Sequence, residues 1–272
     1  MTKTENKAVP FRWLTLLFGI PLRVRLPFGS CWIARNDATG RMILRGHFEN
    51  AESRFIKQFL KPGMVVLDIG AHHGYYSLLA SQKVGPTGRV IAFEPSLRER
   101  RILLQHLRLN ACTNVQVEET ALGETEGRAE FFVVQGRETG CNSLRPPDVR
   151  QPTQATEVRV ARLDDFIRQQ DLKRVDFVKM DVEGAELSVL KGATEFLERR
   201  PRPVIFCEVQ DLRTRPWGYA AREIVDFLRQ RSFSWYVPSA DGAVRPLPPG
   251  QIEFDGNFVA VPEEKLGEFP FS

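Results

Sequence analysis

The chain has 272 residues, of which 42% are hydrophobic and 26% are charged. These values are ordinary for globular proteins, exclude a largely disordered chain or a collagen-like fibre, and suit one α/β domain with a substantial core. The net charge is +4, from 38 basic and 34 acidic residues, and the arginines are scattered, so the charge does not require a nucleic-acid partner.

Residues 1–50 are predicted to form an N-terminal cap, and residues 51–272 the main domain. The apolar stretch 13–20 reads as a short helix that is too short to span a bilayer and has no cleavage site after it. Its basic flanks leave open that residues 11–25 lie on a membrane surface, although packing against the domain is the favoured interpretation. Two short strands are expected at 31–36 and 41–46, around a turn at 37–40.

Helices and strands alternate from residue 50 onward. A helix capped by Asn50 and stopped by Pro62 leads to a strand at 64–70, which a helix at 75–84 follows. A strand ending near Glu94, a helix capped by Ser96 and a third strand at 114–122 continue the pattern. This alternation predicts a parallel, doubly wound sheet.

The alternation breaks once and then returns. Residues 127–134 and 156–163 read as an inserted β-hairpin around an irregular, Pro-rich segment at 135–155, which is a candidate wall of a substrate site. Strands are expected again at 174–184 and 203–209, with helices at 185–200 and 220–231, and a last pair of strands at 233–238 and 257–262. The prediction is a Rossmann-like, mostly parallel seven-stranded sheet.

The four cysteines are far apart and none shows C-x-x-C spacing, so we expect free thiols and a cytoplasmic protein.

The stretch 65–80 (VVLDIGAHHGYYSLLA) combines a buried strand, a glycine loop and a helix, which is the entry half of a nucleotide-binding unit. The loop pattern is Asp68-x-Gly70-x-x-x-Gly74. An acid at the strand end disfavours a pyrophosphate and suits a ligand with an ammonium group and hydroxyls, such as S-adenosylmethionine. Glu94, at the end of the next strand, is placed to accept hydrogen bonds from both ribose hydroxyls. A tight turn with surface acids is the alternative.

Further acids follow the later strands. Asp181 and Glu183 lie in VKMDVEGAE (178–186), and Glu208 ends the strand at 203–209. Since the carboxyl ends of parallel strands meet at one sheet edge, these side chains should converge near Asp68 and Glu94. A magnesium site of Asp181, Glu208 and Asp211 is a less favoured alternative, because acids at strand ends also serve cofactor binding. No metal is expected.

The sequence resembles the FkbM-type methyltransferases, a branch of the class I S-adenosylmethionine-dependent enzymes, from roughly Glu52 to Val261. The resemblance rests on LDIGAHHGYYSLLA, GRVIAFEP, LDDF, VKMDVEGAELSVLKGA, CEV and GNFVAVP in the expected order. It implies the class I methyltransferase fold and O-methylation of hydroxyls on sugars, glycolipids or other natural products. It further implies a set of cofactor-binding residues: Asp68, Gly70, Ala71, His72, Gly74, Glu94, Pro95, Glu119, Thr120, Ala121 and Asp181. His72 stands where many members have Asn, which puts the contact made there in question.

For the reaction itself, Asp181 is the favoured base, with His73 and Glu183 behind it. A histidine in a tight loop usually serves geometry, so His73 is interpreted mainly as a loop-shaping group. The candidate substrate residues each have a structural alternative as turn, cap or core-edge residues: Ser143, Glu208, Trp217 and Asn257.

We therefore predict an S-adenosylmethionine-dependent O-methyltransferase that acts on a small-molecule or glycan hydroxyl. The alternatives are a methyltransferase acting on nitrogen or nucleic acid, and a non-catalytic module that binds the cofactor. No nucleic-acid partner is expected, and the oligomeric state does not follow from the sequence.

Overall fold

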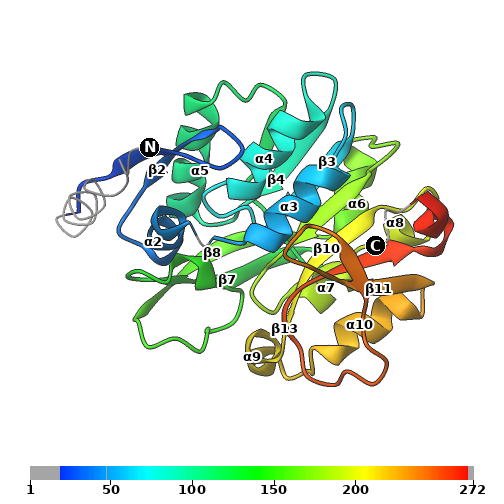
Figure 1. Cartoon of the computed structure of the whole chain (residues 1–272). Helices are drawn as coiled ribbons and strands as arrows, with labels where there is room; N and C mark the ends of the chain where they lie inside the picture. The colour runs from blue at the N-terminus through cyan, green and yellow to red at the C-terminus, as the bar shows by residue number, and fades with distance from the viewer. Residues whose placement is uncertain (1–18, 47, 269–272) are drawn as a thin grey trace.

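The structure is a computed structural model that describes residues 19–46 and 48–268 (Figure 1). Its centre is an eight-stranded sheet in the order β12-β11-β13-β10-β9-β3-β4-β5. The strands are β3 (Val65–Ile69), β4 (Arg89–Phe93), β5 (Val115–Glu118), β9 (Phe177–Met180), β10 (Val204–Gln210), β11 (Phe233–Pro238), β12 (Val244–Pro246) and β13 (Asp255–Pro262).

Five neighbouring strands, from β5 to β10, run parallel, and β13 lies antiparallel between β10 and β11. The predicted Rossmann-like, mostly parallel fold is confirmed. The strand count of seven was too low by one, since β12 adds a short hairpin partner to β11. Its three residues end in Pro246, and a proline, which cannot donate a ladder hydrogen bond, is tolerated on such an edge strand.

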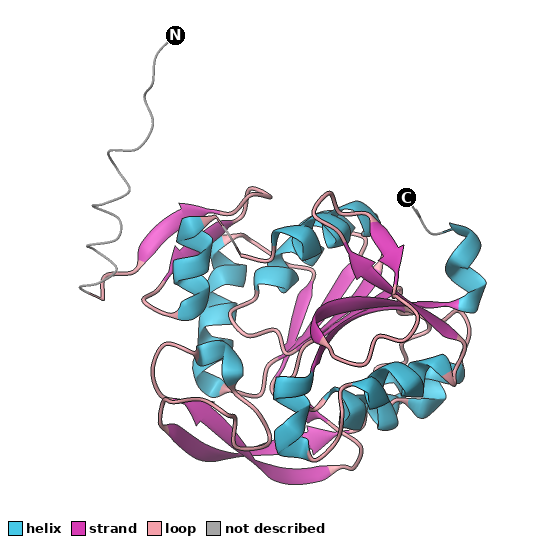
Figure 2. Cartoon of the chain, turned by 60° about the horizontal axis from the view of Figure 1, so that its bottom comes forward, coloured by secondary structure: helices cyan, strands magenta, loops and turns pink. Residues whose placement is uncertain are grey.

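Alternating side chains of the strands build two apolar cores, one on each face of the sheet. Val66 and Val90 face the helices α3 (Asn50–Phe59), α4 (Tyr75–Val84) and α5 (Leu97–Leu109). Leu67 and Ile91 face the opposite core, with the helices α6 (Leu163–Gln169), α7 (Glu186–Lys191), α8 (Thr194–Glu198) and α10 (Arg222–Arg229). Figure 2 shows the helices flanking the strands.

The prediction of a strand at 41–46 is wrong. Residues 41–45 belong to helix α2 (Ala38–Arg45), and Gly46 is its C-cap. The Asp37 carboxylate accepts a hydrogen bond of 2.7 Å from the amide of Gly40 and caps the helix, and Gly46, at φ +73°, ends it. The strand β2 (Cys31–Ala34) pairs instead with β1 (Leu22–Arg25). Trp32 of β2 packs in the same core as α4, and the division into two domains at residue 50 stays a prediction.

The predicted helix at 185–200 is broken into α7 and α8 at Gly192. A Cβ on Gly192 would lie 2.0 Å from the carbonyl oxygen of Gly123, so only glycine fits there. The Asp164 carboxylate then accepts the amide hydrogen of Phe196, at 2.9 Å, near the start of α8. The cap of α3 is Glu49 and not Asn50, whose side chain donates to the carbonyl of Gly46.

The inserted hairpin is present and gains a third strand. β7 (Gly127–Val134) pairs antiparallel with β8 (Thr153–Ala161), and β6 (Ala121–Leu122) pairs with β8 on its other side. The predicted strand at 114–122 therefore divides between two sheets, because β5 stays in the central sheet and β6 leaves it. The connection between β7 and β8 carries the short helix η1 (Thr139–Cys141).

No helix in the described part of the chain combines the length and apolar character needed to cross a membrane. Most of the apolar stretch 13–20, and the part of 11–25 that precedes residue 19, lie outside the described residues.

Candidate active site

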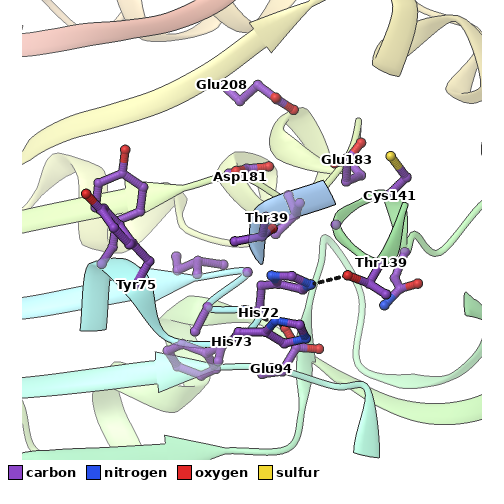
Figure 3. A pocket seen from close by; sticks show the side chains of 18 of the residues that line it. Thr39, His72, His73, Tyr75, Glu94, Thr139, Cys141, Asp181, Glu183 and Glu208 are labelled. Carbon is purple, nitrogen blue, oxygen red and sulfur yellow. Dashed lines mark hydrogen bonds between the residues drawn. The ribbon is translucent and has the colours of Figure 1, made fainter. Parts of the chain in front are cut away.

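A cavity of about 340 Å³ opens at the carboxyl ends of β3, β4, β9 and β10. Residues of α2 and η1 form part of its wall, including Thr39 and Thr139. In Figure 3, Glu94 lies on one side of this cavity and Asp181, Glu183 and Glu208 lie on the other, with the two histidines between them. The sheet edge thus brings together most of the residues that the sequence singled out.

The glycine loop between β3 and α4 approaches its neighbours too closely for side chains. Gly70 has φ +80°, and a Cβ there would lie 1.8 Å from the carbonyl oxygen of Asp181. Gly74 has φ +88°, and its Cβ would lie 2.3 Å from Leu103. Gly70 lines the cavity and allows a close backbone approach there, as in a cofactor loop, whereas Gly74, predicted to bind the cofactor, packs on Leu103 and does not line the cavity.

Asp68 lies beneath this loop and does not line the cavity. It is 1% exposed, and its carboxylate accepts a hydrogen bond of 2.5 Å from the Ser77 hydroxyl at the start of α4. Burial raises the pKa of Asp68, and the nearby Lys179 ammonium opposes that shift. The structure places Asp68 as a brace between strand and helix.

Glu94 is 5% exposed at the end of β4. Its two carboxylate oxygens accept hydrogen bonds from the backbone amides of His72, at 2.7 Å, and Ser96, at 2.8 Å. Burial and the carboxylate of Glu99 raise the pKa of Glu94 to about 8, while the two amides favour the ionised form. The carboxylate is held rigidly at the cavity wall.

Of the other residues predicted to bind the cofactor, some line the cavity and one does not. Ala71, Pro95, Thr120 and Ala121 line the cavity. Glu119 does not, because its side chain is 77% exposed and pairs with Arg100 at 3.1 Å.

Of the two histidines of the loop, His73 is buried and His72 is half-buried. Their rings stack with centroids 3.7 Å apart, and His72 Nε2 lies 3.1 Å from the Thr139 hydroxyl. His106 donates from Nδ1 to the carbonyl of His73, at 2.8 Å. Burial lowers the pKa of His72 to about 4 and that of His73 well below its ordinary value. Both rings are neutral near pH 7, which fits a role in shaping the loop.

Three carboxylates meet on the far side of the cavity. Ligand oxygens of Asp181, Glu183 and Glu208 all lie within 4.8 Å of one another. Burial and the neighbouring Asp181 raise the pKa of Glu183 to about 8 and that of Glu208 well above its ordinary value. One oxygen of Glu208 is buried without a hydrogen-bond partner. At this wall the cavity therefore places carboxyl groups that can exchange protons with a bound acceptor.

Two cations balance these acids. Lys179 Nζ lies 3.2 Å from Asp181 Oδ2 and 3.2 Å from the carbonyl of Gly70. Although burial disfavours its ammonium form, the carboxylates of Asp181, Asp68 and Glu49 raise the pKa of Lys179. Arg213 Nε lies 2.8 Å from Glu183 Oε2, in an ion pair that lacks hydrogen-bond geometry.

Sequence reasoning missed several cavity residues. Glu49, which bonds the Tyr76 hydroxyl, has its pKa raised to about 7 by burial. Thr39, Thr139, Lys179 and Arg213 also line the cavity. A lysine inside the apolar strand FVKM was the one signal present in the sequence, since a buried lysine needs a partner.

Of the predicted substrate residues, Glu208 alone lines the cavity. The Ser143 hydroxyl donates to the backbone carbonyl of Glu183 at 2.9 Å, and Asn257 pairs opposite Glu208 across β10 and β13. Trp217 packs against Gly184, where a Cβ would lie 2.6 Å from the indole. These contacts support the walls of the site from outside.

Asp211, the third member of the alternative metal set, begins the short helix α9 (Asp211–Thr214). Its two oxygens accept hydrogen bonds from the amides of Ala221, at 3.2 Å, and Phe254, at 2.9 Å. The structure groups Glu183, and not Asp211, with Asp181 and Glu208.

The methyltransferase FkbM domain family matches residues 68–234, which is more than half of the chain. The chain belongs to the FkbM methyltransferase family. The predicted resemblance to this family of S-adenosylmethionine-dependent enzymes is confirmed.

The chain is also similar to three proteins with different names and lengths. The AMB antimetabolite synthetase AmbE of Pseudomonas aeruginosa is 31% identical over 206 residues, which cover 64% of this chain and 10% of AmbE. The methyltransferase sdnD of Sordaria araneosa is 32% identical, over 48% of this chain and 60% of its own length. The 2-O-methyltransferase NoeI of Sinorhizobium fredii is 26% identical, over 62% of this chain and 72% of NoeI. The chain thus spans under two thirds of the length of the first two.

Proposed function

We propose that this FkbM-family protein transfers a methyl group from S-adenosylmethionine to a hydroxyl of a sugar, glycolipid or other natural product. The observation that carries the proposal is one cavity with a rigid carboxylate, Glu94, on one side and the cluster of Asp181, Glu183 and Glu208 on the other. The name of NoeI, a 2-O-methyltransferase, supports oxygen as the methyl acceptor.

The residues present fit the cofactor. The backbone at Gly70 leaves no room for a side chain, so the loop allows a close backbone approach to the cofactor there. Glu94 would accept hydrogen bonds from the ribose hydroxyls, and Thr120 and Ala121 would lie beside the adenine ring. When bound, S-adenosylmethionine supplies an electrophilic methyl group on a sulfonium.

The carboxylate cluster would orient the acceptor and take its proton. Asp181, paired with Lys179, presents a carboxylate to the cavity and is the proposed base. Glu208, whose pKa is raised well above its ordinary value by burial and by Asp181, would carry a proton near pH 7 and donate a hydrogen bond to the acceptor. The wall from α2 and η1 would exclude water around the reacting oxygen.

The direct test is methyl transfer by the full chain from methyl-labelled S-adenosylmethionine to a panel of sugars, glycolipids and hydroxylated natural products. We expect label on an acceptor oxygen, and calorimetric binding of S-adenosylmethionine but not of NAD. Label on acceptor nitrogen, or on RNA, would contradict the proposed acceptor class, and binding without turnover on any acceptor would favour the non-catalytic alternative.

Metal removal is expected to leave turnover nearly unchanged. Lys179 and Arg213 already supply positive charge to the three carboxylates, so the cluster does not depend on a divalent cation for balance. Turnover should be measured after treatment with EDTA and after adding magnesium back. A complete loss that magnesium reverses would instead assign Asp181, Glu183 and Glu208 as ligands of a metal.

A further inference from the structure

We propose that one face of the protein, made by β1, β2, α2 and α5, docks on the anionic headgroups of a phospholipid bilayer. This basic face consists of the exposed side chains of residues 19–46 and 97–110. Its exposed side chains lie outside the cavity apart from Ala38 and Met42, and none of them is assigned to the reaction.

The charge of these two segments has one sign at the surface. They contain nine arginines, and their two carboxylates, Asp37 and Glu99, are 6% and 0% exposed. Five of the arginines are exposed: Arg23, Arg25, Arg45, Arg101 and Arg108. Arg100 of α5 pairs with the exposed Glu119 at the margin of the face, and the five exposed arginines leave an excess of positive charge that attracts a polyanion.

Apolar side chains stand between these arginines. The described residues include six exposed large hydrophobic side chains, and four of the six belong to the basic face: Ile20 (54% exposed), Met42 (37%), Leu97 (54%) and Leu104 (38%). On α5, Leu97, Arg101, Leu104 and Arg108 follow one another at helical spacing, so they form one mixed stripe along the helix.

The segments form one surface because β2 packs directly on α5. The amide of Ile33 donates to His106 Nε2 at 3.1 Å, and the Arg35 guanidinium donates to the Gln105 side chain at 2.8 Å. Figure 1 shows β2, α2 and α5 on the same side of the molecule.

The mixture favours a bilayer over a nucleic acid. Exposed aliphatic side chains enter the acyl boundary while arginines bind phosphate headgroups, which is the pattern of peripheral membrane surfaces. Proteins that bind single-stranded nucleic acid combine arginines with exposed aromatic rings for base stacking. All four large hydrophobic side chains exposed on the basic face are aliphatic.

Helix α2 connects the basic face to the cavity. Met42 is exposed on the face and also lines the cavity, next to Thr39. Docking would therefore bring an acceptor carried by a lipid close to this wall of the cavity. This last step rests on the proposed function, whereas docking itself does not.

The experiment is flotation of the full chain with vesicles of phosphatidylcholine alone and of phosphatidylcholine mixed with phosphatidylglycerol. We expect binding to the mixed vesicles only, weakened by salt. The double variant Arg101→Glu with Arg108→Glu should bind at least about tenfold more weakly. Leu97→Ser with Leu104→Ser should remove the fraction of binding that survives high salt.

The matched control is Arg222→Glu with Arg229→Glu, which makes the same charge change on helix α10, where Asp226 pairs with both arginines. This variant should bind as the unaltered protein does, although the loss of its two ion pairs with Asp226 should lower its melting temperature somewhat. All variants should remain folded at the assay temperature and keep methyl transfer to a soluble acceptor. Equal loss in the control, or no binding to phosphatidylglycerol vesicles, would refute the proposal. Tight binding of single-stranded RNA that is lost only in the α5 arginine variant would assign the face to nucleic acid instead.

Discussion

Replacing Asp181 by Asn is expected to lower turnover by roughly 10²–10⁴-fold, the range typical of a lost general base, and to leave cofactor affinity nearly intact. The reason is local. Asp181 presents its carboxylate to the cavity, with Lys179 Nζ 3.2 Å away. Glu94 lies on the other side of the cavity and is held by the backbone amide of His72, so the substitution at Asp181 leaves the contacts of Glu94 in place. Asn keeps the shape of the side chain and removes the charge that accepts the proton.

The measurement compares single-turnover rates with the dissociation constant of S-adenosylhomocysteine for each variant. His73→Ala serves as the contrast, and we expect a much smaller loss of turnover, because burial keeps that imidazole neutral and stacked on His72. Melting curves show whether either protein is misfolded. Near wild-type turnover in Asp181→Asn, together with an inactive but folded His73→Ala, would reverse the two roles.

The sheet could be predicted from the sequence because its strands are buried on both faces and read as apolar runs with glycine or proline between them. Helix α2 could not, since RMILRG has the composition of a strand and its helical state depends on the cap that Asp37 forms with Gly40. The break between α7 and α8 lies at Gly192, where the backbone of Gly123, distant in the chain, leaves no room for a Cβ.

The site was predictable where it follows from strand ends. Glu94, Asp181 and Glu208 sit where parallel strands stop, so topology alone brings them to one edge. Thr39 and Glu49 come from the segment before β3, and no periodicity connects that segment to the cavity. Ser143 and Trp217 have side chains that could contact a substrate, but Ser143 donates to the backbone carbonyl of Glu183 and Trp217 packs against Gly184.

Glu94 is expected to determine both the strength and the pH dependence of cofactor binding. Glu94→Gln should weaken binding of S-adenosylhomocysteine by roughly 10- to 150-fold, which corresponds to about 1.5–3 kcal/mol for a lost charge-assisted contact. Two effects combine. The amide cannot accept as strongly from two hydroxyls, and its NH₂ group must face the backbone N–H of either His72 or Ser96, which now donate to the two oxygens.

The sign of the pH effect follows from the raised pKa of about 8. Below that pH much of Glu94 is protonated in the free protein, and ligand hydroxyls donate best to the ionised form. Affinity should therefore increase as the pH rises through about 8 and then level off, with proton release on binding. Calorimetry in buffers of different ionisation enthalpy measures the affinity and the number of protons released on binding. Glu183 also has a pKa of about 8, so the Gln variant is the deciding control. If its affinity still rises with pH by the same factor, the titrating group is not Glu94, and the ribose assignment loses its support.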